Sequence, residues 1–98
     1  MEYKNEKLGC SFSLPDALTV RQQLSFWDRF FNGEGECNAV RNWEAGKSLI
    51  TNWQCEDMPD ANASLDEMTG VKQARIVTWA GQQVSNMIMG LEEPAPNS

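Results

Sequence analysis

Three stretches of this 98-residue chain place apolar residues three or four positions apart, and this spacing constrains the fold more than any other feature. It matches the turn of an α-helix, in which one face recurs about every 3.6 residues. The stripes are Val20, Leu24, Trp27 and Phe31; Val40, Trp43, Gly46, Ile50 and Trp53; and Val77, Ala80, Val84, Ile88 and Leu91. The sequence therefore predicts three principal helices.

Capping and helix-breaking residues set the expected bounds of these helices. The first should run over residues 19–32, because a capping-box pattern opens it and an Asn-Gly pair closes it. The second should occupy roughly residues 37–54. Another capping box at residues 64–67 predicts a short helix that Thr-Gly interrupts, and a longer helix should follow over residues 71–90.

A short strand is expected before the first helix. Apolar and small polar residues alternate over residues 8–14 until Pro15, which is the two-residue period of a half-buried strand. A lone strand cannot satisfy its own backbone groups. It must therefore pair with another strand of the chain or with a second copy, or lie on the helices as an extended arm.

These elements predict a mainly α fold: a small helical domain of about three principal helices with a short N-terminal strand or extended arm. The length suits one domain, residues 1–98. The polar segments 1–7 and 92–98 are expected to be mobile termini. Small residues Ala45 and Gly46 favour close packing of the second helix inside the molecule over an interface.

Net charge and cysteine usage argue against several classes of partner and ligand. A net charge of −6, with eight scattered Lys and Arg residues, argues against nucleic acid. The three cysteines, Cys10, Cys37 and Cys55, lack metal-ligand spacing, and the chain has no histidine. Free, mostly buried thiols in a reducing compartment are expected; a disulfide from Cys10 to Cys37 or Cys55 is the alternative. We expect no metal, no membrane partner and no targeting segment.

The sequence does not contain a recognisable catalytic constellation. General acid–base and thiol chemistry most often rely on histidine, which is absent, and no pair of acids stands out. The pair Gly33 and Gly35 lacks the third glycine of a phosphate-binding loop, and acidic residues flank it. We therefore predict a non-enzymatic binding protein without a cofactor.

Several short sequence segments, taken together, resemble those of the small tail assembly chaperones of long-tailed bacteriophages of the siphophage type. They are Leu18-Thr-Val-Arg-Gln-Gln-Leu24 after Phe12-Ser-Leu-Pro15, Asn42-Trp-Glu-Ala45 with Trp53-Gln-Cys55, Trp79-Ala-Gly81, and the closing Gly90-Leu-Glu92-Glu-Pro94. The resemblance implies a largely helical, self-associating protein of the host cytoplasm. It would coat the phage tape measure protein during tail assembly and be absent from the finished virion.

The aromatic residues supply the candidate contact residues for such a role. Phe26 and Phe30 form a second apolar strip beside the first stripe, which widens the apolar face beyond the needs of one small core. One of these two faces is expected to meet a partner. Phe26, Phe30, Trp43 and Trp79 are the predicted client or self contacts, with a role in the core as the alternative.

Two other functions fit the same size and charge. A small acidic inhibitor of a host defence complex, similar to anti-CRISPR proteins, would occupy a basic groove. A small structural virion protein would use the N-terminal arm and proline-rich tail to tie neighbours together.

Overall fold

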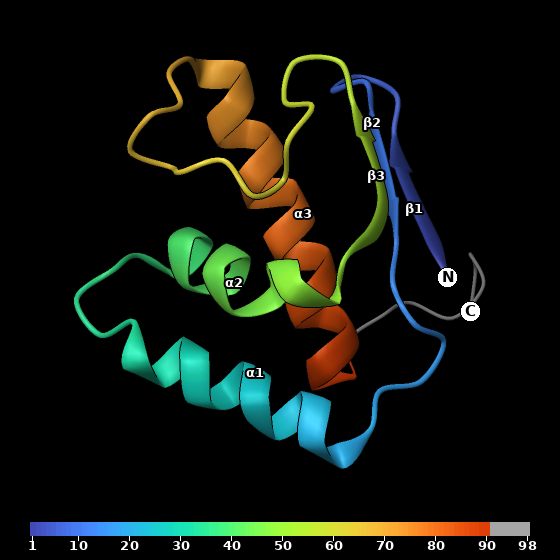
Figure 1. Ribbon diagram of the computed structural model, residues 1–98, viewed down its shortest axis with the longest axis vertical. Helices are drawn as coiled ribbons and strands as arrows, with labels where there is room; N and C mark the ends of the chain where they lie inside the picture. The colour runs from blue at the N-terminus through green and yellow to red at the C-terminus, as the bar shows by residue number, and fades with distance from the viewer. Residues whose placement is uncertain (91–98) are drawn as a thin grey trace.

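The computed structural model describes residues 1–90 and combines three helices with a three-stranded antiparallel sheet (Figure 1). The fold is therefore mixed α/β rather than mainly α, although the three principal helices are present. In chain order the elements are β1 (Glu2–Asn5), β2 (Cys10–Ser13), α1 (Val20–Asn32), α2 (Asn38–Gly46), a 3₁₀ turn (Lys47–Leu49), β3 (Thr51–Cys55) and α3 (Val71–Met89). The predicted mobile tail, residues 92–98, lies outside the described residues.

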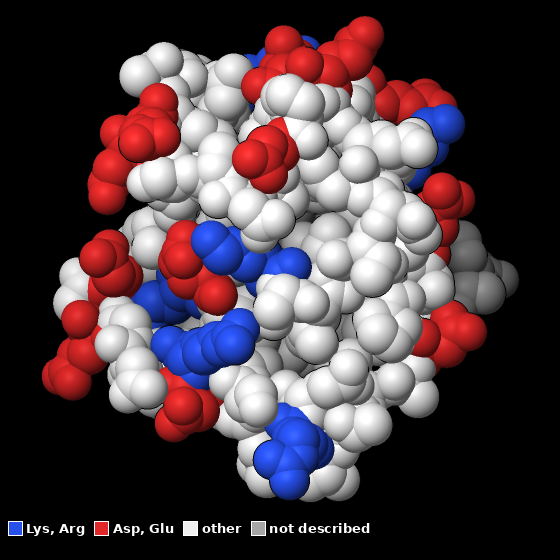
Figure 2. All heavy atoms as spheres, viewed as in Figure 1, with Lys and Arg blue, Asp and Glu red and all other residues white. Residues whose placement is uncertain are grey.

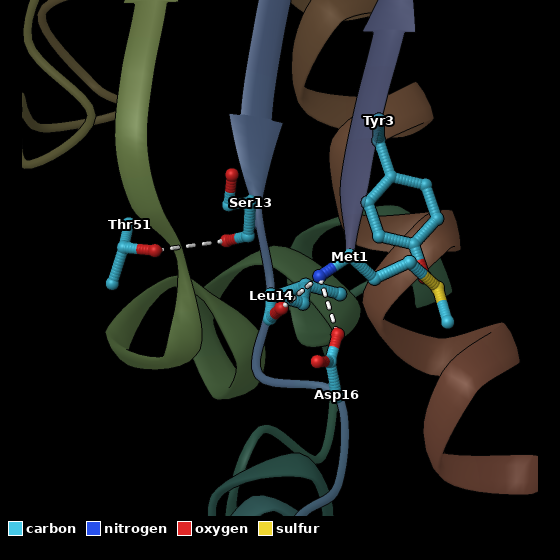
Figure 3. A network of polar contacts seen from close by, with 6 residues as sticks. All are labelled: Met1, Tyr3, Ser13, Leu14, Asp16 and Thr51. Carbon is cyan, nitrogen blue, oxygen red and sulfur yellow. Dashed lines mark hydrogen bonds and ion pairs between the residues drawn. The ribbon is translucent and has the colours of Figure 1, made fainter.

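The predicted strand within residues 8–14 is β2, and it pairs on both sides with strands of its own chain. It lies between β1 and β3, antiparallel to each. Residues 1–7, expected to be mobile, contain β1. Its start is fixed by the Met1 ammonium, which donates to the Leu14 carbonyl at 2.9 Å and to Asp16 Oδ1 at 2.8 Å (Figure 3). The same ammonium lowers the pKa of Asp16 through this hydrogen bond and its charge.

The predicted second helix over residues 37–54 is wrong in its last part, because residues 51–55 form β3. Helix α2 ends at Gly46, and one 3₁₀ turn leads into the strand. The residues Ile50 and Trp53 continue a helical spacing, but a short apolar run is equally compatible with a strand. Pairing with β2 decides between the two.

A bulge in β3 lets the strand keep its apolar residues on the inner face. Ser11 lies opposite Gln54 and Ser13 opposite Thr51, so β3 has one residue more than β2 between these pairs. Asn52 adopts the left-handed conformation there, with φ of 55°. The extra residue allows both Trp53 and Ile50 to pack against the core.

The cysteines near the ends of the sheet form a disulfide, so the expectation of free thiols is wrong for this pair. Cys10 and Cys55 lie directly opposite each other on β2 and β3 and are bonded. Both are buried. Cys37 is free and exposed.

The helices α2 and α3 cross closely where the segments 42–45 and 79–81 meet. A Cβ atom added at Gly46 would lie 2.7 Å from Cγ1 of Val84, and one added at Gly81 would lie 3.0 Å from the backbone nitrogen of Trp43. Each helix therefore presents a glycine to the other. The favoured interpretation of Gly46, close packing inside the molecule, is confirmed.

Helix α3 begins at Val71 and ends at Met89, with Gly90 in the left-handed conformation as its cap, close to the predicted bounds. The short helix predicted at residues 64–67 is only a turn. Ser64 accepts a backbone hydrogen bond from Glu67, but Gly70, with φ of 109°, prevents a helix from continuing into α3.

The core lies between the sheet, α3 and the pair α1 and α2 (Figure 1). Phe12 on β2 meets the Trp79 ring on α3 edge-on, with 5.2 Å between ring centroids. The largest fully buried side chains are Phe12, Phe26, Trp43, Ile76 and Val84. Among residues 1–90, no helix combines the length and apolar character needed to cross a membrane.

Candidate contact surfaces

Helix α1 presents an apolar stripe to solvent. Its start follows from the predicted capping box: the Gln22 backbone donates to Thr19 Oγ1 at 3.1 Å, and the Thr19 backbone donates to Gln22 Oε1 at 2.9 Å. Along the helix, Val20 is 69% exposed, Leu24 62% and Phe31 64%. These three residues, here called the α1 stripe, are apolar area that the described chain leaves uncovered.

The neighbouring strip of α1 faces inward. Phe26 is fully buried, and Phe30 is half-buried. The Arg41 guanidinium lies over the Phe30 ring, 4.2 Å from its centroid, and Arg41 Nε donates to the Phe30 carbonyl at 2.8 Å. Of the two apolar faces of α1, this one holds α1 against α2 and the other remains open.

The two tryptophans among the predicted contact residues also belong to the interior. Trp43 on α2 is fully buried against Trp53, with ring centroids 5.6 Å apart. Its indole Nε1 has no hydrogen-bond partner among residues 1–90. Trp79 on α3 is half-buried against the core. In this conformation Phe26 and Trp43 offer no surface to a partner, whereas Phe30 and Trp79 offer part of theirs.

Charged side chains border the α1 stripe. Arg21 and Asp28 are exposed, and neither side chain has a hydrogen bond or ion pair with another residue in the range 1–90. Arg29 differs, because it donates to Ser48 Oγ at 3.0 Å. Figure 2 shows Lys and Arg side chains over α1 and α2 with some Asp and Glu side chains among them, while further Asp and Glu side chains lie toward the edges of this face. Side chains of both charges therefore lie close together on this face.

A second apolar surface lies on another part of the molecule. A hollow of about 300 Å³ opens between α2, residues 65–70 and α3. We call it the apolar hollow and define it by its apolar lining residues, which are Ala39, Val40, Leu65, Met68, Ala74 and Val77. The exposed Cys37 also lines it. Such a concave apolar surface suits an inserted apolar side chain.

In the range 1–90, no three Cys, Asp or Glu side chains come together as metal ligands. Two apolar surfaces among the described residues are open to a partner, the α1 stripe and the apolar hollow. Comparison with models of protein families, with curated proteins and with solved structures finds no match to this chain.

Proposed function

We propose that this protein is a non-enzymatic tail assembly chaperone of a long-tailed bacteriophage. It self-associates and coats the tape measure protein while the tail is assembled. The single observation that carries the proposal is the presence of two separate apolar surfaces, the α1 stripe and the apolar hollow, that the described chain leaves unfilled.

Two surfaces suit the two contacts that coating requires. A protein that coats a long client must touch both the client and neighbouring copies of itself, and one surface cannot do both at once. Amphipathic helices commonly dock by placing apolar side chains into a groove. The apolar hollow offers such a groove, and the flexible thioether of Met68 in its wall adapts to different side chains.

The charge of the protein is compatible with this role. A formal charge of −6 keeps copies soluble although each exposes apolar area. The function does not require a reactive group, so it agrees with a site made of apolar side chains.

The test is co-expression with the tape measure protein encoded in the same genome, followed by affinity purification and light scattering. Several copies per tape measure chain are expected. Met68→Glu in the apolar hollow should reduce the number of bound copies, because it introduces a charge where the client side chain inserts. Val71→Ser is the matched control: Val71 is 69% exposed and is not among the residues that line the hollow.

A soluble tape measure protein without bound copies would refute the proposal. Stoichiometric amounts of the protein in purified particles would instead favour a structural virion protein. Binding to a basic host defence complex that collapses as salt rises would favour an inhibitor.

A further inference from the structure

We propose that the α1 stripe is the surface where two copies of this chain meet, with their α1 helices packed antiparallel about a two-fold axis near Ser25. This dimer surface would carry the self-association that the proposed function requires, and the proposal rests on the proposed function in this one respect. The spacing, exposure and charge of residues on α1 support it.

The apolar residues of α1 have the spacing of a helix-pairing seam. Val20, Leu24, Trp27 and Phe31 follow one another at intervals of four, three and four residues, which is the pattern of positions that meet in paired helices. Trp27 is half-buried at the inner edge of the stripe. In an antiparallel pair, Val20 of one copy lies near Phe31 of the other, so a small side chain meets a large one at each end, and Leu24 lies near the axis.

The charged residues beside the stripe favour antiparallel over parallel packing of the two α1 helices. Arg21 and Asp28 are seven residues apart, or about two helical turns, so they lie on the same side of α1. Antiparallel packing places Arg21 beside Asp28 of the second copy, and the two-fold axis repeats this contact. In a parallel pair the Arg21 and Asp28 flanks of the two helices would lie on opposite sides of the seam, so these charges would not meet each other. The surface is therefore complementary to itself in one direction only.

These charges are available for contacts with another molecule. Neither side chain of the Arg21 and Asp28 pair is engaged within residues 1–90, whereas the nearby Arg29 is held by Ser48. The net charge of −6 opposes the approach of two copies, but at physiological salt this long-range repulsion is screened beyond about 8 Å. Contacts at the stripe then decide whether the copies remain together.

The area of the stripe predicts a weak dimer. At their observed exposures, Val20, Leu24 and Phe31 offer on the order of 350 Å² per copy, less than half of the roughly 800 Å² per partner in a stable interface. The dimer should therefore depend on concentration, with a dissociation constant on the order of tens of micromolar or weaker. Such a weak contact becomes effective when copies are brought together on one client.

The first experiment is sedimentation velocity of the full chain from about 5 to 500 µM, a range that brackets such an affinity. The wild-type protein should shift from monomer to dimer across this range. Leu24→Glu should remain monomeric throughout, because it places a charge in the centre of the seam. Val71→Ser should dimerise like the wild type, since it removes an equally exposed apolar residue from α3.

The second experiment tests direction by exchanging the charges. Arg21→Asp alone and Asp28→Arg alone should each raise the dissociation constant about tenfold, because each turns two attractive contacts into repulsive ones. The double variant, Arg21→Asp with Asp28→Arg, should restore the wild-type constant to within about threefold. Thermal unfolding of every variant checks that these exposed substitutions leave the monomer folded.

Each failure has a distinct meaning. A wild-type protein that remains monomeric at the highest concentration would overturn the inference, and a dimer that tolerates Leu24→Glu would overturn the choice of surface. A double charge exchange that fails to restore dimerisation would overturn the antiparallel arrangement. Co-purification with the tape measure protein is read separately, so bound copies with a monomeric free protein would leave the client-binding proposal standing.

Discussion

The close crossing of α2 and α3 predicts that Gly46→Ala destabilises the protein, although alanine is the better helix former. The new Cβ would lie 2.7 Å from Cγ1 of Val84, 3.0 Å from its Cβ and 3.3 Å from its Cγ2. Val84 cannot turn away easily, because it is fully buried and a β-branched residue in a helix has one strongly preferred rotamer. One of the two helices must therefore move.

Two opposing effects set the size of the change. Inserting a methyl group into a packed core costs about 1–3 kcal/mol. Replacing glycine in a helix recovers at most about 1 kcal/mol, and less at the last residue of α2, where Gly46 lies. The expected result is a loss of about 1–2 kcal/mol in the free energy of unfolding, measured by urea denaturation of the oxidised protein.

A double-mutant cycle isolates the contact. Val84→Ala alone should cost about 2–3 kcal/mol, from the buried methyl groups lost and the cavity left behind. In the double variant the methyl group of residue 46 enters that space, so the combined loss should be about 1–2 kcal/mol smaller than the sum of the single losses. Val77→Ala is the matched control, because Val77 is buried on the same helix but is not among the atoms nearest Gly46.

Losses in the Gly46 and Val84 pair that add to within about 0.5 kcal/mol would refute a close contact between the two residues. An increase in stability of Gly46→Ala would refute it too, since the helix preference of alanine would then outweigh the contact. Gly46→Ala combined with Val77→Ala should be additive within the same limit, which tests that the coupling belongs to the crossing and not to α3 as a whole.

Three further perturbations test the sheet and its N-terminal end. Cys10→Ser should lower the free energy of unfolding by about 4 kcal/mol in the chain-entropy view, because the bond to Cys55 closes a loop with a sequence separation of 45 residues. Cys37→Ser should leave the urea denaturation curve unchanged. Identical urea denaturation curves for the two variants would contradict this prediction. Asn52→Gly should raise stability in thermal unfolding by about 0.5–1 kcal/mol, because glycine adopts its positive φ without strain, and a decrease would count against the bulge. The lowered pKa of Asp16 contributes stability above the ordinary aspartate pKa that disappears as pH falls through the folded value. Asp16→Asn should therefore lose less stability than the wild type in urea denaturation series below about pH 4, and identical acid responses would refute this contribution.

Local signals in the sequence predict the helix ends better than the sheet. The capping box at Thr19 and the left-handed cap at Gly90 act within one turn, so the bounds of α1 and α3 follow from neighbouring residues. The identity of β3 depends instead on β2, about 40 residues earlier in the chain. The ring of Trp53 stacks on that of Phe12 in β2, with 5.9 Å between ring centroids. No residue near Trp53 in the sequence indicates this contact, so the predicted end of the second helix is wrong.

The same distinction explains the contact surface on α1. This helix carries two apolar strips, and spacing alone cannot say which one α2 will cover. Phe26 and Phe30 are predicted contact residues, yet a large ring also fills a core well, and Phe26 is buried in the core. The informative residues are Arg21 and Asp28, because charged side chains beside an apolar strip cannot be buried cheaply without a partner. Their position indicates the strip that remains accessible, and their opposite signs, two turns apart, give that strip a direction that apolar residues alone do not carry.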